Sequence, residues 1–349
     1  MFDFIIVGQG IAGSLLAWFL HQAGKSFLVM DDSAAISPSR ITSGIVNPVT
    51  GRRLVKTWLA DELLTFADST YAAIEKELNT PLYEPLKIVR LFDSVKSQND
   101  WSVRCSSDEY SPYLDNNTVV HLNPKTINNP FGGFEIKGAS RLHTSLFLEK
   151  LKNYLRSNQQ FTEGKFAYAE LEVTDSSVSY KGVKARHIIF AEGTQALQNP
   201  YFSNLPFQPA KGECLLVHIP DFPHSFMIKS EVTILPFYEK DIYYVGATHD
   251  AFFENPFPSE KGKSELLQGL QAVLKCTFKV LDHWAAVRPA VKGRRPLIGT
   301  HPQFKNVSIF NGLGTKGVSL APFFANHFTQ HLLHGTPLMP EVDIKRFLS

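Results

Sequence analysis

The first 32 residues of the chain carry the pattern that most restricts its fold. A wholly apolar run, Phe4–Val7, predicts a strand that is buried on both faces. Gly8, Gly10 and Gly13 follow at G-x-G-x-x-G spacing, and the apolar stretch over 11–23 predicts a helix. Such glycines allow a tight turn, a close approach of a pyrophosphate to the backbone, and close packing of helix on strand. The pattern therefore predicts a site for an adenine dinucleotide.

A second predicted strand, over 26–30, ends at two carboxylates. Asp31 stands 18 residues after Gly13, a separation at which an acid can accept ribose hydroxyls, and Asp32 is the alternative. The start of the helix, at Ile11 and Ala12, offers free amides and a positive dipole end to phosphates. A purely structural glycine turn is the other interpretation, and the acid at the end of the strand argues against it.

Composition narrows the class of protein. A length of 349 residues allows two domains, and 44% hydrophobic with 19% charged residues is typical of an ordinary globular protein. A net charge of +2 does not support a general polyanion-binding surface. Cys105, Cys214 and Cys276 form no C-x-x-C pair, so we expect buried thiols, no metal site and a reducing compartment.

The position of the first strand bears on location. It begins almost at Met1, which leaves no room for a signal peptide, and no apolar run approaches the roughly 20 residues of a membrane span. We therefore expect a cytoplasmic protein.

Hydrophobic periodicity predicts the elements along the chain. Helices are expected over 54–78 (as one or two), 145–156, 263–274 and 318–333. Strands are expected over 87–92, 118–122, 166–173, 177–180, 187–193, 205–217, 231–237, 241–248 and 307–310. The chain thus begins and ends with strand, glycine turn and helix, and short strands separated by Asn, Pro and Gly lie between. This order predicts an α/β fold, α+β overall, with a mainly antiparallel second sheet.

Five segments occur in an order that resembles the FAD-dependent amine and amino-acid oxidases, the family of D-amino-acid oxidase, glycine oxidase and sarcosine oxidase. They are the N-terminal unit, the strand end 191–193, and the segments 209–213, 287–299 and 312–322. The resemblance spans nearly the whole chain. It looks nearest to the FAD-dependent oxidase domain of the bifunctional enzyme that modifies the wobble uridine of tRNA.

The resemblance implies a discontinuous, Rossmann-like FAD-binding domain of residues 1–79, 137–204 and 285–349. Residues 80–136 and 205–284 would then form a mostly antiparallel substrate domain that covers the flavin. No cysteine aligns with a site of covalent attachment, so FAD is expected to be held non-covalently. The expected cofactor-binding residues are Gly8, Gly10, Ile11, Ala12, Gly13, Asp31, Asp32, Thr42, Ser43, Gly44, Val173, Ala191, Gly193, Gly312, Gly314, Thr315, Lys316 and Gly317.

Four residues are candidates for the chemistry. Arg288 matches the arginine that pairs with a substrate carboxylate in several members, and a planar fork suits that role, although a buried structural ion pair is the alternative. Lys316 would stabilise negative charge at the pyrimidine end of the reduced flavin, or be a solvated loop cation. Tyr244 and His249 would line the pocket over the flavin, with a structural histidine as the alternative for His249.

Two segments depart from the family pattern. The stretch 293–295 is Gly-Arg-Arg, where the pattern often has an aspartate, and Glu192 replaces a residue that is commonly small. Arg52 and Arg53, beside the predicted flavin turn, would bind pyrophosphate or an acidic substrate, or form a surface pair.

The function expected from the resemblance is oxidation of the C–N bond of a small amine or amino acid with a carboxylate, by hydride transfer to flavin and reoxidation by oxygen. A 2-hydroxy acid dehydrogenase is one alternative. A flavin oxidase that acts on tRNA is another, motivated by two basic clusters and opposed by the near-neutral net charge. The clusters are Arg52, Arg53 and Lys56, and Lys292, Arg294 and Arg295.

Overall fold

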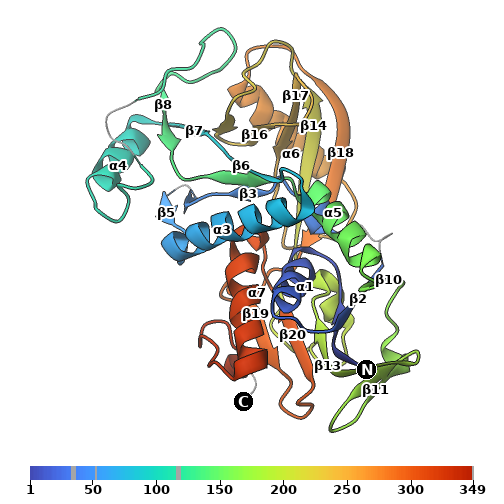
Figure 1. Cartoon of the computed structure of the whole chain (residues 1–349). Coiled ribbons are helices and arrows are strands. Elements are labelled where there is room, and N and C mark those ends of the chain that lie inside the picture. The colour runs from blue at the N-terminus through green and yellow to red at the C-terminus, as the bar shows by residue number, and fades with distance from the viewer. Residues whose placement is uncertain (33–36, 52, 115–118, 348–349) are drawn as a thin grey trace.

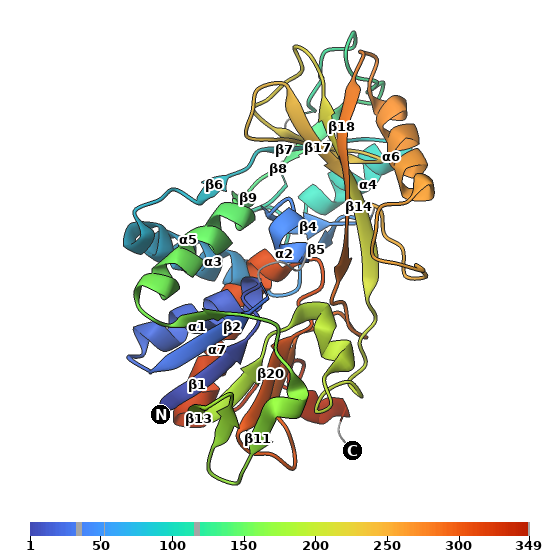
Figure 2. The same ribbon diagram turned by 90° about the vertical axis from the view of Figure 1, so that its right-hand side faces the viewer.

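The computed structural model describes residues 1–32, 37–51, 53–114 and 119–347. Two large sheets lie one above the other, with the long helix α3 (Ala60–Leu78) running between them in the view of Figure 1. The N- and C-terminal segments both contribute to the lower sheet, and Figure 2 shows the strands of the upper sheet standing over it. Segments far apart in the sequence therefore meet in the lower half of the molecule.

The lower sheet has eight strands among the described residues and a parallel centre. β10, β2, β1, β13 and β20 run parallel to their neighbours in that order, so their carboxyl ends share one edge. β12, β11 and β19 add antiparallel pairs. The bounds are β1 (Phe2–Val7), β2 (Phe27–Asp31), β10 (Phe161–Glu163), β11 (Leu171–Val173), β12 (Val178–Tyr180), β13 (Val183–Phe190), β19 (Leu297–Thr300) and β20 (Val307–Asn311).

The predicted βαβ unit forms as expected. Residues 4–7 of β1 are buried, and β1 pairs in parallel with β2 through helix α1 (Ile11–Gln22). Leu15, Leu16 and Leu20 of this helix have no exposed surface, because it packs on the sheet and against α7 (Gly317–His334). Burial of each such side chain contributes about 1.5–3 kcal/mol.

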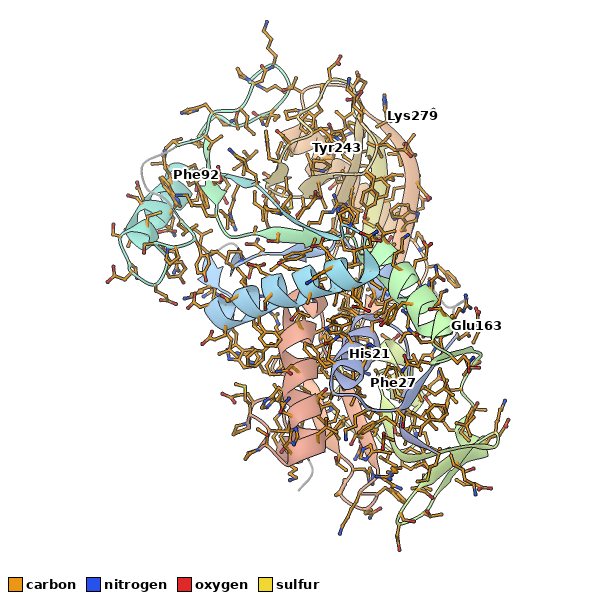
Figure 3. The ribbon with its side chains drawn as sticks, in the orientation of Figure 1. His21, Phe27, Phe92, Glu163, Tyr243 and Lys279 are labelled. Carbon is orange, nitrogen blue, oxygen red and sulfur yellow. The ribbon has the colours of Figure 1, made fainter. Side chains whose placement is uncertain are left out.

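The upper sheet has seven strands and is antiparallel except where β15 meets β7. Its bounds are β18 (Lys279–Arg288), β14 (Ala210–His218), β17 (Ile242–Gly246), β16 (Thr233–Pro236), β15 (Met227–Lys229), β7 (Ile88–Leu91) and β8 (Gly133–Ile136). Alternation along β17 sends Tyr243 to the face covered by α6 (Glu260–Val273) and Tyr244 to the other face. Figure 3 labels Tyr243 within this sheet and Phe27 in the lower one.

Two small sheets and further helices join the halves. Their bounds are β3 (Ile45–Val46), β9 (Ser140–Leu142), β6 (Tyr83–Pro85), β4 (Val49–Thr50), β5 (Val55–Lys56), α2 (Pro38–Ile41), α4 (Val95–Cys105) and α5 (Thr144–Ser157), with 3-10 turns at Tyr168–Glu170, Gly193–Gln198 and Ile344–Phe347.

The structure corrects several local predictions. The helix expected from residue 54 begins only at Ala60, and the strand β18 was not expected. Helix α4 was not expected; it begins at a capping box in which Ser94 and Ser97 bond each other's backbone amides, a signal present in the sequence. Residues 119–122 form only an isolated bridge instead of a strand, and Thr118 lies outside the described residues. The stretch 166–173 contains a 3-10 turn before the three residues of β11.

No helix in the described part of the chain has both the length and the apolar character that a bilayer span requires. Within the same residues, no cluster of three or more His, Cys, Asp or Glu side chains is arranged to hold a metal ion.

Candidate active site

The turn after β1 is built from glycines that have different tasks. Gly8 has a φ of +102°, and a Cβ there would lie 2.5 Å from the carbonyl oxygen of Ala191. A Cβ on Gly13 would lie 1.9 Å from the carbonyl oxygen of Gly8. These two glycines therefore allow α1 and β13 to approach the turn, and any side chain at either position would push the backbone apart.

Gly10 is the glycine that leaves open space. Within 4 Å of a Cβ at this position, the structure places only the hydroxyl of Ser39, at 3.3 Å. The same hydroxyl accepts a hydrogen bond from the amide of Ile11 at 3.2 Å, at the start of α1. An oxygen acceptor thus already occupies the helix N-terminus, where a phosphate oxygen would bind. Ser39 was not among the predicted site residues.

Asp31 is bonded to the glycine turn. Its Oδ1 accepts from the amide of Gln9 at 2.8 Å, and Oδ2 lies 3.6 Å from the guanidinium of Arg40. Burial raises the pKa of Asp31, although the Gln9 amide and Arg40 oppose the shift. The carboxylate therefore lies at the carboxyl end of β2, beside the turn.

The predicted turn of Thr42, Ser43 and Gly44 follows α2 and packs on the chain that leads into α5. A Cβ on Gly44 would lie 1.9 Å from the carbonyl oxygen of Leu142, and the hydroxyl of Thr144 donates to the carbonyl of Thr42 at 3.3 Å. Thr42 is exposed, and Gly44 is buried. The absence of a side chain at Gly44 thus brings β3 against β9.

The carboxylate of Glu192 does not line an open surface but is bonded to two neighbouring side chains. Its carboxylate accepts from Tyr168 Oη at 2.7 Å and from Asn199 Nδ2 at 2.8 Å. Burial raises the pKa of Glu192 to about 7, with these two hydrogen bonds opposing the shift. Gly193, the next residue, is open, because a Cβ at this position would have no atom within 4 Å. Gly193 therefore leaves room for a ligand, whereas Ala191 is buried against the glycine turn.

Val173 does not lie near the glycine turn and Asp31. It pairs with Val178, which pairs with Ala185, and Ala185 pairs with Phe2 at the start of β1. In the register of the sheet, Val173 is level with the beginning of β1, whereas the glycine turn follows the end of β1. Gly164 does lie beside Asp31, because its amide donates to the Asp31 carbonyl at 3.0 Å.

The C-terminal glycine turn converges on the N-terminal one because β1, β13 and β20 are neighbours. A Cβ on Gly317 would lie 3.0 Å from Cγ2 of Ile11, so the starts of α7 and α1 are in contact. Gly312 is packed against Val291, whereas a Cβ on Gly314 would meet only Ala290, at 3.9 Å. Gly314 and its neighbour Thr315 therefore border open space near the end of β18, the strand that carries Arg288.

Lys316 is not a solvated loop cation. Its ammonium donates to Thr57 Oγ1 at 2.9 Å and to Thr50 Oγ1 at 3.4 Å, just before α7 begins. Burial lowers the pKa of Lys316 to about 8, and the charges of Arg295 and Arg294 add to the shift. Hydroxyl groups therefore hold this ammonium, and no carboxylate of the described residues pairs with it.

Arg288 ends β18 on the face of the upper sheet that lies opposite α6. It runs over Gly212, where a Cβ would lie 1.9 Å from Nη2, and Nη1 donates to the carbonyl of Thr248 at 3.2 Å. Burial lowers the pKa of Arg288, and Tyr244 and Cys214 act in the opposite direction. No carboxylate among the described residues pairs with it, so the alternative of a structural ion pair finds no support.

The structure separates the other predicted pocket residues. Tyr244 lies on the same face as Arg288, and burial raises its pKa well above the usual range, with Cys214 adding to the shift. His249 follows β17 and is exposed. Arg53 is also exposed, and Arg52 lies outside the described residues. Tyr243 is structural, since its hydroxyl donates to the carbonyl of Phe222 at 2.6 Å on the far face.

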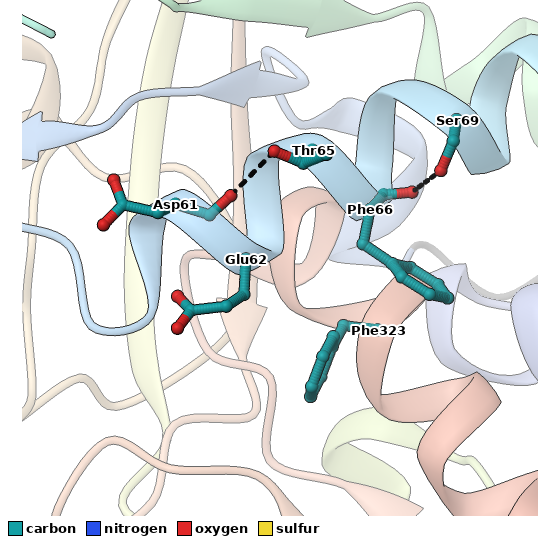
Figure 4. A pocket seen from close by; sticks show the side chains of 6 residues that line it. All are labelled: Asp61, Glu62, Thr65, Phe66, Ser69 and Phe323. Carbon is teal, nitrogen blue, oxygen red and sulfur yellow. Dashed lines mark hydrogen bonds between the residues drawn. The ribbon is translucent and has the colours of Figure 1, made fainter.

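A cavity of about 460 Å³ lies elsewhere, over α3 and α7. Figure 4 shows the rings of Phe66 and Phe323 beside the acidic residues Asp61 and Glu62. It contains none of the predicted site residues. A second cavity, of about 320 Å³, includes Thr57 and Trp58 and so borders the surroundings of Lys316.

A parallel sheet with two convergent glycine turns lies under an antiparallel sheet that carries a half-buried arginine, an arrangement that is typical of a nucleotide-dependent oxidoreductase. The chain belongs to the DAO family of FAD-dependent oxidoreductases, whose family model matches residues 3–331. The predicted fold class is confirmed.

Relatives and solved structures agree with this assignment. The chain is 23% identical to a glycine oxidase from Bacillus subtilis (strain 168), over 92% of this chain and 90% of that protein. Its fold is similar to iminodiacetate oxidase from Chelativorans sp. BNC1, with a TM-score of 0.74, 22% identity and coverage of 99% and 98%. Glycine oxidase from Geobacillus kaustophilus gives a TM-score of 0.77 at 16% identity, with coverage of 97% and 95%.

FAD is the cofactor of the family, as the sequence predicted. The residues at the end of β1 fit a dinucleotide, because Gly10 leaves space, the Ile11 amide faces an oxygen acceptor, and Asp31 lies at the adjacent strand end.

Proposed function

We propose that the enzyme oxidises the C–N bond of a small amine or amino acid that carries a carboxylate, with oxygen as the electron acceptor. The observation that carries this proposal is Arg288, a half-buried guanidinium without a carboxylate partner among the described residues. Relatives named as glycine oxidase and iminodiacetate oxidase support the same class of substrate.

The proposed FAD site lies along the carboxyl edge of the lower sheet. Gly10, Ile11 and Ala12 would hold the pyrophosphate, and Asp31 the ribose, with Arg40 and Ser39 as additional contacts. Ala191, Gly193 and the turn from Gly312 to Gly317 would border the flavin end. We leave Val173 out of this site. The separation of strands into two large sheets supports the proposed boundaries near residues 80, 137 and 205, whereas β18 runs through residue 285, so we move the last boundary to the end of that strand.

FAD supplies the acceptor for the hydride that leaves the substrate carbon. Arg288 binds the carboxylate through its planar fork and thereby orients the adjacent carbon. Tyr244 packs beside Arg288 and excludes water from this face. Lys316, held by Thr57 and Thr50 at the positive end of α7, places a cation where negative charge develops.

Anaerobic mixing tests the substrate class. The FAD-loaded enzyme would be mixed with glycine, N-methyl amino acids, both enantiomers of larger amino acids, and 2-hydroxy acids, while flavin absorbance is followed. Bleaching by an amine that carries a carboxylate is the expected result. Bleaching by hydroxy acids alone would replace the proposal with a 2-hydroxy acid dehydrogenase.

The basic clusters give little support to an activity on tRNA. Lys56 is paired with Asp61 at 2.6 Å, which removes it from an RNA-binding face. Arg295 instead lies over the ring of Trp58, at 4.1 Å from its centroid. Backbone binding of RNA needs a continuous basic surface. Titration of the protein with bulk tRNA at low salt, followed by fluorescence anisotropy, should therefore show no salt-sensitive binding.

A further inference from the structure

We propose that Arg294, Arg295 and Lys316 form a second anion site, which binds an oxyanion such as a carboxylate or phosphate. Two cations from separate segments meet at adjacent residues, because Arg295 lies over the ring of Trp58 and the ammonium of Lys316 donates to Thr57. The exposed Arg294 directly precedes Arg295 in the chain. The inference rests on the proposed function for the identity of the anion, which we assign to a second acidic group of the amine substrate.

Two of the three charges are held in place by neighbouring residues. The guanidinium of Arg295 lies 4.1 Å from the centroid of the Trp58 ring, and that ring stacks on Phe324 at 5.5 Å with an angle of 11° between planes. The ammonium of Lys316 is bound by the hydroxyls of Thr57 and Thr50. A cation that is already positioned loses little side-chain entropy when an anion arrives.

No acidic side chain in the described part of the chain forms an ion pair with this cluster. Among the described residues, none of the three cations forms an ion pair, and Glu341 acts on Arg295 only at longer range. Both arginines repel the ammonium of Lys316, which is itself half-buried. Like charges held together in a partly buried place destabilise the protein unless an anion offsets them. The start of α7, immediately after Lys316, adds the positive end of a helix dipole.

The backbone that leads to the cluster approaches the backbone that follows Arg288. The chain passes from Arg288 to Ala290, which lies beside Gly314, two residues before Lys316. The anion site and Arg288 therefore flank the same glycine turn. A substrate with two acidic groups can engage both, so we infer that the enzyme prefers an amine with two acidic groups to one with a single carboxylate.

Binding of inorganic phosphate to the FAD-loaded enzyme tests the site without relying on turnover. Calorimetric titration at constant ionic strength should detect binding, and Arg295→Met should weaken it about tenfold or more, because a charge-assisted hydrogen bond is lost. Arg104→Met is the matched control, since Arg104 also lies over an aromatic ring, that of Tyr110, at 5.3 Å. Absence of binding, or equal weakening in both variants, would overturn the site.

Steady-state kinetics then identify the source of the anion. Iminodiacetate and aspartate should have a higher kcat/KM than sarcosine and alanine, and Arg295→Met should reduce that preference about tenfold. Phosphate should compete with the diacids. If an amine is oxidised but mono- and diacids behave alike in both proteins, the diacid assignment is wrong and the proposed function stands. If no amine reduces the flavin while phosphate still binds, the proposed function fails and the anion site stands.

Discussion

The guanidinium of Arg288 occupies the space that a side chain at position 212 would fill: a Cβ on Gly212 would lie 1.9 Å from Nη2, 2.3 Å from Cζ and 2.6 Å from Nη1. The two residues come from paired strands, where Gly212 lies opposite Ala286 and Arg288 opposite Ala210. Gly212 thus acts as a positioning residue for the proposed substrate anchor.

The substitution Gly212→Ala should displace Arg288 while FAD stays bound. A shift of about 1 Å in a positioning group can cost about 100-fold in rate, so we expect a large fall in kcat/KM with an unchanged flavin spectrum. A double-mutant cycle with Arg288→Lys provides the check, because the two effects should not add. Additive losses would show that Gly212 acts independently of Arg288.

The substitution Arg288→Lys should raise KM. A lysine keeps the charge but not the planar fork, and loss of one charge-assisted hydrogen bond costs about 1.5–3 kcal/mol, or roughly 10–100-fold in kcat/KM. The flavin absorbance and the Tm serve as controls for cofactor binding and folding. Unchanged kinetics would exclude Arg288 as the carboxylate anchor.

Two glycines of the same turn should respond differently to substitution. Gly10→Val fills space that the structure leaves open, so we expect a folded but colourless apoprotein. Gly13→Ala places a Cβ 1.9 Å from a backbone oxygen, so we expect loss of the fold itself. Circular dichroism and flavin absorbance measured on both variants separate the outcomes. Yellow Gly10→Val protein would contradict the proposed pyrophosphate site.

The stability of the protein should fall as pH rises from about 4.5 to about 7 through Glu192. Its pKa is raised to about 7 in the folded state by burial, so the folded protein holds a proton that the unfolded chain has released. This proton stabilises the fold below pH 4.5, and the contribution is lost as the pH rises through 7, a change of about 3 kcal/mol. Urea unfolding at several pH values measures the free energy of unfolding. Its decline between pH 4.5 and pH 7 should be smaller in Glu192→Gln than in the wild type.

Lys316 should give the bound flavin a titration near pH 8. The ammonium is charged below this pH and neutral above it, because burial and the two arginines lower its pKa to about 8. If Lys316 borders the pyrimidine end of the flavin, the visible absorption of the flavin should change around pH 8 in the wild type. The change should be absent in Lys316→Met, and its persistence there would place Lys316 away from the cofactor.

Several features were predictable because they depend on local sequence. The order of strand, glycine turn and helix around Gly8, Gly10 and Gly13 has few physical solutions, and the parallel pair β1 and β2 follows from it. The apolar helix at the end of the chain was also predicted nearly to its bounds, because its apolar pattern continues to Gly335, a left-handed C-cap. Helix α4 was missed, since a capping serine pair is a weaker signal than an apolar stripe.

The sequence by itself determined the nucleotide unit, the family resemblance and the candidate arginine, because each rests on residues that are close along the chain. Only the tertiary structure decided which candidates meet. It placed Val173 at the wrong end of the sheet, left His249 exposed, turned Glu192 toward Tyr168, and joined Arg295 to Trp58. Strand register and the direction of each side chain set these relationships, and both depend on pairing between segments more than 100 residues apart, as in β1 with β13.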